Sequence, residues 1–211
     1  MWGIFMRLKS YEDMNLQELD VMKEISSIGT SHAATALSKL LQKEVRITIP
    51  EISILSYEET VDRIGHMEEL VAATLVQMKN EVEGLMLFIF KMDLANAVLG
   101  KLLERHYQSF EELDEMDFSA LEEIGNIIIC SYVNAFTQLV GVEIDLSVPS
   151  STINMLGGIL TVPIAEYGYE TDKLMYINAE FIMDGEKLSD GLLMLPDIKS
   201  LNSILEKLGI S

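Results

Sequence analysis

Two stretches of the chain, about a hundred residues apart, carry apolar residues at helical spacing. Between Leu16 and Leu41, and again between Phe118 and Leu139, apolar side chains recur every three or four positions and so fall along one side of a helix. Asn15, directly before the first stretch, is a suitable N-cap. The apolar positions are Leu19, Met22, Ile25, Ala33, Ala36, Leu37 and Leu40 in the first stretch, and Phe118, Leu121, Ile124, Ile128, Tyr132, Phe136 and Leu139 in the second. The pattern predicts two long helices, each buried along one side.

A short run of alternating apolar and polar residues follows each predicted helix and ends at a proline. The runs are Val45 to Pro50 and Val142 to Pro149, and such alternation indicates half-buried strands. Farther along come paired strand-like runs, each pair expected to form a hairpin that leads into a short helix capped by an aspartate. These pairs are Leu70 to Met78 with Gly84 to Phe90, before Asp93, and Leu174 to Met183 with Leu192 to Leu195, before Asp197.

The order of long helix, strand, hairpin and short helix therefore occurs twice, which indicates an internal duplication. A shift of 99 residues lays Asp20 on Ser119, Glu24 on Glu123, Ser27 on Asn126 and Pro50 on Pro149. We expect residues 1–211 to form a single pseudo-symmetric domain of two repeats, about residues 16–108 and 115–211. The hairpins favour an α+β fold in which the long helices pack on a mostly antiparallel sheet.

The charge and the cysteine content narrow the choice of partners and sites. Against 15 Lys and Arg stand 34 Asp and Glu, for a formal net charge of −19, which repels nucleic acid and anionic lipid surfaces. The single cysteine, Cys130, cannot form an internal disulfide, and no cysteine–histidine cluster suggests a metal. No apolar run approaches about 18 residues, so we expect no membrane insertion. Together with the charge and the cysteine content, this predicts a cytoplasmic protein that binds neither nucleic acid nor a metal.

Three polar side chains interrupt the apolar pattern of the second long helix: Ser119, Glu123 and Asn126. At about 100° per residue, the spacing i, i+4, i+7 places them within roughly 60° of one another on the side away from the apolar residues. Ser119 could instead begin the helix as a cap. The neighbouring Gly125 fits either a close approach by another backbone or tight packing on the sheet. Taken alone, Glu123 and Asn126 fit a solvated helix face better than an active site.

The wider spacing changes that interpretation. From Ser119 the second copy reads Ser-x3-Glu-x2-Asn-x22-Pro, ending at Pro149. This motif resembles the active-site signature of the CheC, CheX and FliY phosphatase family of chemotaxis, in which Asp or Ser is followed by x3-Glu-x2-Asn-x22-Pro. The first copy keeps the spacing but lacks the asparagine, and reads Asp20, Glu24, Ser27 and Pro50. A double copy on a chain of this length is similar to a CheC-type member, and the resemblance extends from Leu16 to Gly209.

The resemblance implies a hydrolase whose substrate is the aspartyl phosphate of a CheY-type response regulator in two-component signalling. Asn126 would enter the regulator's site and hold the attacking water in line, since a carboxamide offers a donor and an acceptor without added charge. Glu123, one helical turn earlier, would pair with the regulator's active-site lysine, and Ser119 and Pro149 complete the motif. No cofactor of its own is expected, because Mg²⁺ is held by the regulator.

The first copy departs from the motif at its asparagine position. The hydroxyl of Ser27 is shorter than a carboxamide and presents one oxygen, so we expect a single active site, with the first copy weak or inactive. An alternative is that Asp20 and Glu24 still dock a regulator without hydrolysis. A second hypothesis for the whole chain is a non-catalytic adaptor. It would bind either a response regulator or the receptor deamidase CheD, which is a partner of CheC-type proteins.

Overall fold

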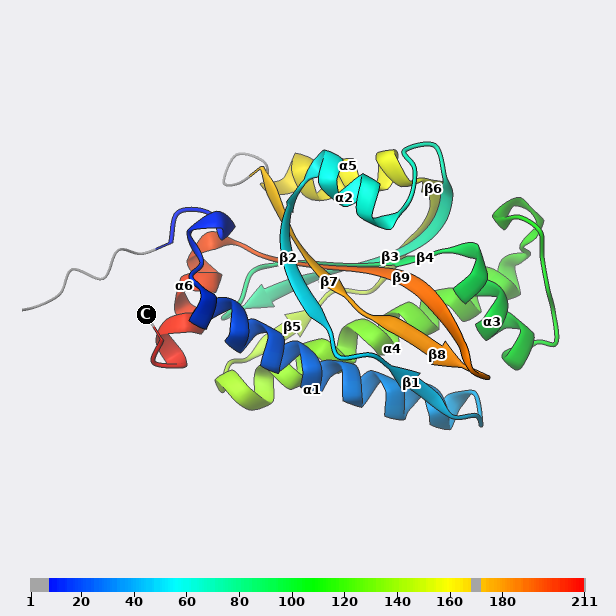
Figure 1. The fold of residues 1–211 in the computed structure, drawn as a ribbon, viewed down its shortest axis with the longest axis horizontal. Coiled ribbons are helices and arrows are strands. Elements are labelled where there is room, and N and C mark those ends of the chain that lie inside the picture. Colours follow the sequence, from blue (N-terminus) through cyan, green and yellow to red (C-terminus); the bar gives the residue numbers. More distant parts are fainter. Residues whose placement is uncertain (1–7, 168–171, 211) are drawn as a thin grey trace, which may run out of the picture.

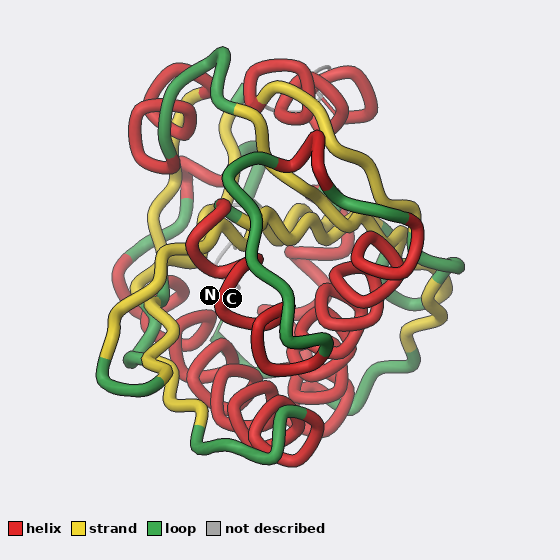
Figure 2. Tube along the Cα trace, turned by 90° about the vertical axis from the view of Figure 1, so that its right-hand side faces the viewer, coloured by secondary structure: helices red, strands yellow, loops and turns green. Residues whose placement is uncertain are grey.

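The structure is a computed structural model, and it describes residues 8–167 and 172–210. Two long helices, α1 and α4, lie side by side on one face of a sheet, while α2 and α5 cover the opposite face (Figure 1). Figure 2 shows the same three layers from the side. The helices are α1 (Leu16–Leu40), α2 (Tyr57–Ile64), α3 (Met92–Leu102), α4 (Glu115–Val140), α5 (Leu156–Tyr167) and α6 (Ile198–Lys207). The fold is α+β.

Within the described residues the strands pair in antiparallel fashion, in agreement with the sequence prediction. The strands are β1 (Val45–Ile47), β2 (Glu51–Ser56), β3 (Leu70–Asn80), β4 (Gly84–Phe90), β5 (Ile144–Leu146), β6 (Ser150–Met155), β7 (Lys173–Asn178), β8 (Glu180–Met183) and β9 (Glu186–Pro196). Strands β3, β4, β7 and β9 are mostly buried on both faces, as a sheet covered by helices on both sides requires.

The predicted duplication is confirmed by the order of the elements. Short 3₁₀ helices at Tyr11–Asp13 and Phe110–Glu112 precede α1 and α4, with an offset of 99 residues between their starts. The same offset relates β1 to β5 and β2 to β6. Beyond this point β3 corresponds to β7 and β8 together, and α3 corresponds to α6.

The two halves exchange strands. Strand β2 of the first half pairs with β7 of the second, and β6 of the second half pairs with β3 of the first. Strand β4 then pairs with β9 across the centre of the sheet. The sheet of each half is therefore completed by a strand of the other. The assignment of the whole chain to one domain, and the repeat boundaries at 108 and 115, stay predictions.

The long helices begin where polar side chains satisfy their first backbone amides. Asn15 caps α1 as predicted, in a capping box with Glu18. Helix α4 begins three residues earlier than the apolar pattern indicated, because Asp114 and Asp117 form the equivalent capping box. Asp197 caps α6 as predicted. The prediction for Asp93 is wrong, since α3 already begins at Met92 after Lys91.

The strand predictions need three corrections. The two runs ending at proline form strands over only Val45–Ile47 and Ile144–Leu146. At Thr48 and Ser147 the side-chain hydroxyl, in place of a backbone carbonyl, accepts the amide of the neighbouring strand. The run from Leu174 to Met183 is divided into β7 and β8 at Ala179. The strand–helix units β2–α2 and β6–α5 were not predicted, because each is short and neither shows a clear period of two or of 3.6 residues in sequence.

Helices α1 and α4 approach each other closely at Gly29. A Cβ atom at this position would lie 2.9 Å from the Cα of Tyr132, so only glycine permits this crossing. One residue on, the hydroxyls of Thr30 and Tyr132 share a hydrogen bond of 2.6 Å. The apolar sides of both helices are buried or half-buried as predicted, except near their ends, where Leu40 of α1 is 40% exposed and Leu139 of α4 is 44% exposed.

Candidate functional site

The polar stripe of the second motif lies on the outer side of α4. Ser119 and Glu123 are exposed, and Asn126 is half-buried. Ser119 stands five residues beyond the N-cap Asp114, so the alternative that it caps the helix is wrong. The orientation away from the core agrees with the sequence prediction, with the asparagine set deeper than its two neighbours.

An ion pair between the partly exposed Arg105 and the buried Asp117 fixes the start of α4, just before this stripe. Asp117, fully buried, accepts hydrogen bonds from Arg105 at 3.0 Å and from the phenol of Tyr107 at 2.6 Å. The phenol–carboxylate hydrogen bond raises the pKa of Tyr107. The backbone amide of Asp117 and the Arg105 guanidinium lower the pKa of Asp114, the N-cap. The Asp114 carboxylate is therefore held in the charged state that caps a helix N-terminus well.

The close packing of α4 on the sheet explains Gly125. A Cβ atom here would lie 2.5 Å from Oγ1 and 2.8 Å from Cβ of Thr74 on β3. Of the two interpretations left open by the sequence, tight packing on the sheet is the correct one. The glycine lets the helix rest directly on β3, which sets how deep the adjacent Asn126 lies.

The same threonine connects the helix to the proline end of the motif. Oγ1 of Thr74 and Oγ of Ser151 are 3.0 Å apart, and Ser151 is two residues beyond Pro149 at the start of β6. Thr74 is thus shared between Gly125 and β6. Asn126 and Pro149 have 22 residues between them in sequence, and the segments that carry them meet at this one threonine on β3.

Cys130 is a neighbour of the site that sequence reasoning considered only as a disulfide candidate. Its thiol donates a weak hydrogen bond to Oδ1 of Asn126, with 3.5 Å between sulfur and oxygen. Burial raises the pKa of the Cys130 thiol, and the charge of Glu123 raises it further. The thiol is therefore a neutral donor at neutral pH. The spacing of four residues from Asn126 was the signal that could have revealed it.

The first motif occupies the equivalent place on α1. Asp20 and Glu24 are exposed and Ser27 is half-buried. The hydroxyl of Ser27 donates to the backbone carbonyl of Lys23 at 2.9 Å, so it is turned back onto its own helix. A hollow of about 240 Å³ separates this part of α1 from the start of β2, and its polar lining is Asp20, Lys23, Glu51 and Ser53. The structure thus presents both motifs in the same way, and only the second presents a carboxamide.

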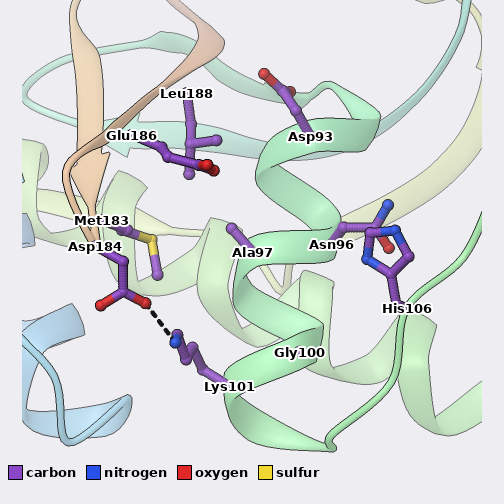
Figure 3. Close-up of a pocket in the computed structure, with 10 residues that line it drawn as sticks. All are labelled: Asp93, Asn96, Ala97, Gly100, Lys101, His106, Met183, Asp184, Glu186 and Leu188. Carbon is purple, nitrogen blue, oxygen red and sulfur yellow. Dashed lines mark ion pairs between the residues drawn. The ribbon is translucent and has the colours of Figure 1, made fainter.

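Another hollow, of about 440 Å³, lies away from both motifs between α3 and the β8–β9 hairpin (Figure 3). Lys101, which lines this hollow, forms an ion pair with Asp184. The pair lowers the pKa of the Asp184 carboxyl. Both amide atoms of Asn96 bond the backbone of Tyr107. His106 lines the same hollow, but no motif residue does, so this cavity is a weaker candidate than the two stripes.

Across residues 8–167 and 172–210, no three His, Cys, Asp or Glu side chains are grouped so that they could hold a metal ion. None of the helices within these residues is both long and apolar enough to cross a membrane.

Comparison with known proteins adds to this geometry. The CheC-like family model matches residues 18–54 and 116–153, and each segment contains one of the two motifs. The chain is 28% identical over 199 residues to the CheY-P phosphatase CheC of Bacillus subtilis (strain 168), which covers 92% of this chain and 95% of that protein. It is 25% identical over 139 residues to the flagellar motor switch phosphatase FliY of the same organism, covering 65% of this chain and 36% of that one.

A solved structure has the same fold. The crystal structure of Thermotoga maritima FliY matches with a TM-score of 0.72 and 20% identity, covering 94% of this chain and 100% of that chain. The full-length match in sequence, the double match to the family model and the shared fold agree with one another. The chain is similar to the CheC-like family, whose model matches both of its motif-bearing segments.

Proposed function

We propose that this protein hydrolyses the aspartyl phosphate of a CheY-type response regulator, with Asn126 as the residue that positions the attacking water. The observation that carries the proposal is the half-buried carboxamide of Asn126 on a rigidly capped helix, with the exposed Glu123 one turn earlier. Two relatives named as phosphatases support it, and one of them is named for CheY-P.

The chemistry needs little from the protein beyond positioning. The water oxygen forms a bond to phosphorus as the bond from phosphorus to the aspartate oxygen breaks, which releases phosphate and regenerates the carboxylate. A Mg²⁺ ion held by the regulator offsets the charge. Oδ1 of Asn126 accepts from Cys130 and keeps a second lone pair for the water, while the amide NH₂ can donate to a phosphoryl oxygen.

Glu123 has a separate task in this proposal. Its carboxylate is exposed one helical turn before Asn126 and would pair with the regulator's active-site lysine. Such a pair fixes the depth to which the asparagine enters. Neither residue forms a covalent bond to phosphorus.

The test is phosphate release from a phosphorylated CheY-type regulator with Mg²⁺. The parent protein should accelerate release over the regulator alone, and Asn126→Ala should lower kcat by about 100-fold, the usual order for losing an oriented transition-state group. Glu123→Gln should raise KM more than it lowers kcat. If Asn126→Ala turns over as fast as the parent, the mechanism is wrong.

The adaptor function is the second candidate, and it rests on the resemblance to CheC-type proteins. The intact Asn126 argues against a protein that only binds, because a pure adaptor has no chemical need for that carboxamide. Co-purification with CheD, measured alongside phosphate release, separates the two roles. Binding to CheD without turnover would favour the adaptor.

A further inference from the structure

Two of the most exposed apolar residues, Val148 and Ile49, stand at equivalent positions in the two halves. Val148 is 86% exposed and Ile49 is 77% exposed, and each directly precedes a motif proline. Isolated exposed apolar side chains are common on protein surfaces. Here, however, an exposed apolar residue occurs at the same position of both halves, 99 residues apart. The segments that join helix to strand in the two halves differ in sequence.

Each of these residues is held in place by the residue before it. Ser147 binds Gln77 of β3 through both its backbone amide and its hydroxyl, at 3.0 Å each. Thr48 does the same with Glu180 of β8, at 2.9 Å each. A residue that precedes proline is also restricted to extended backbone conformations. Val148 and Ile49 are therefore fixed outward with little conformational freedom to lose on binding.

Both residues lie beside a motif. Pro149 leads into β6, which reaches α4 through the Ser151–Thr74 contact next to Gly125. Pro50 leads into β2, where Glu51 lines the hollow that Asp20 also lines. An apolar side chain next to a charged stripe is the usual composition of a protein-binding surface, with an apolar anchor and a polar surround.

From this arrangement we infer that Val148 and Ile49 are apolar docking residues for the response regulator, one beside each motif. The inference rests on the proposed function and extends it to the first half. The first motif then binds a phosphorylated regulator through Ile49, Asp20 and Glu24, while its Ser27, turned onto the carbonyl of Lys23, leaves the phosphate intact. One chain holds two regulators and dephosphorylates one of them.

The regulator is a better occupant of these surfaces than a second copy of this chain. A symmetric contact between two copies places the same patch on both sides. It would therefore bring two surfaces of the same chain together, and that chain has a net charge of −19. A regulator with a lysine at its active site offers the opposite charge to Glu123 and Glu24.

The first experiment measures phosphate release at varied concentrations of phosphorylated regulator. Val148→Asp should raise KM about tenfold, the size of a binding anchor worth about 1.4 kcal/mol, with kcat within twofold of the parent. Leu139→Asp is the matched control, since Leu139 is 44% exposed on α4 outside the motif, and it should change neither constant. An unchanged KM for Val148→Asp overturns the inference, and so does a fall in kcat without a change in KM.

The second experiment counts bound regulators by titration calorimetry, with beryllofluoride and Mg²⁺ on the regulator in place of the phosphoryl group. The parent should bind two regulators per chain, and Ile49→Asp should bind one. Leu40→Asp, the counterpart of the first control and 40% exposed, should bind two. One regulator bound to the parent, or two bound to Ile49→Asp with unchanged affinity, overturns the inference.

Light scattering of the same variants tests the other occupant. If Val148→Asp or Ile49→Asp converts a dimer to a monomer while KM and stoichiometry stay as in the parent, the surfaces are contacts between copies and the inference is wrong. Failure of the proposed function looks different, because the parent itself would then not accelerate phosphate release.

Discussion

The first and second halves of this protein differ less in shape than in one side chain. Helices α1 and α4 share the preceding 3₁₀ turn, the capping box and the exposed pair of polar residues. At the next position of the stripe, Ser27 bonds its own helix, whereas the carboxamide of Asn126 meets only the thiol of Cys130 among the bonds described. The comparison shows that the duplicated fold keeps the same framework around two different side chains.

A second difference lies one residue earlier, beneath the stripe. Gly125 allows α4 to rest on Thr74, whereas the equivalent Ser26 on α1 is fully buried with a hydroxyl that has no hydrogen-bond partner among the described residues. The contact of the second half is the closer one. The catalytic proposal therefore coincides with the half in which the helix lies tighter on the sheet.

Exchange of the stripe residues between the halves is expected to have the largest effect. Asn126→Ser should reduce phosphate release about 100-fold, because a serine hydroxyl cannot hold water at the distance of a carboxamide. Adding Ser27→Asn to that variant should recover at least about tenfold, since Asp20, Glu24 and Pro50 are already in place. No recovery would mean that the halves differ in more than this side chain.

A smaller effect is expected when the contact beneath the stripe is changed. Gly125→Ala should lower the free energy of unfolding by about 1–3 kcal/mol, because the new Cβ clashes with Thr74, and this exceeds the gain in helix propensity of up to ~1 kcal/mol. It should also lower kcat several-fold by displacing Asn126. Denaturant unfolding and phosphate release measure the two effects.

The matched change in the first half should have the opposite sign. Ser26→Ala removes a buried hydroxyl without a partner and should raise the free energy of unfolding by about 1 kcal/mol. A loss of stability in Ser26→Ala would show that this hydroxyl is satisfied in solution and that the two halves pack alike.

The smallest effect concerns the thiol beside the asparagine. Cys130→Ala should lower kcat two- to threefold, in line with a weak S–H···O bond worth about 0.5–1 kcal/mol, and Cys130→Ser should retain the parent rate. Equal rates for all three proteins would show that the thiol does not orient the amide.

The raised pKa of this thiol gives a pH test of the same contact. Because the thiolate is the reactive form, alkylation of Cys130 by iodoacetamide in the folded protein should be slow at neutral pH. The rate of alkylation should rise only at a pH above the ordinary pKa range of a thiol. Glu123→Gln removes a charge that raises the pKa, so the same rate should be reached at lower pH.

The long helices, the hairpins and the duplication could be predicted because each has a strong local signal. Residues 16–41 repeat their apolar positions over many turns, and the capping residue Asn15 marks the start. The stripe on α4 follows from the same periodicity. The 99-residue shift then related the two motifs to each other. The apolar pattern of one helix alone could not have shown that relation.

The remaining features depend on contacts between distant parts of the chain. Strands β2 and β6 pair with the opposite half, and a sequence carries no direct sign of such exchange. The start of α4 depends on Arg105 reaching the buried Asp117, and the role of Gly125 depends on Thr74, far away in sequence. The outward position of Val148 is set by the Ser147–Gln77 bonds, which join residues 70 positions apart.

The exchanged strands also constrain how the chain folds as it is made. β1 and β2 leave the ribosome early, but their partners β8 and β7 lie more than a hundred residues later in the chain. Until those partners appear, the first half carries open strand edges, which are prone to pair with other chains. Separate fragments of the two halves should therefore be poorly soluble alone and recover when expressed together, whereas the intact chain completes its sheet once β7 and β8 have been made.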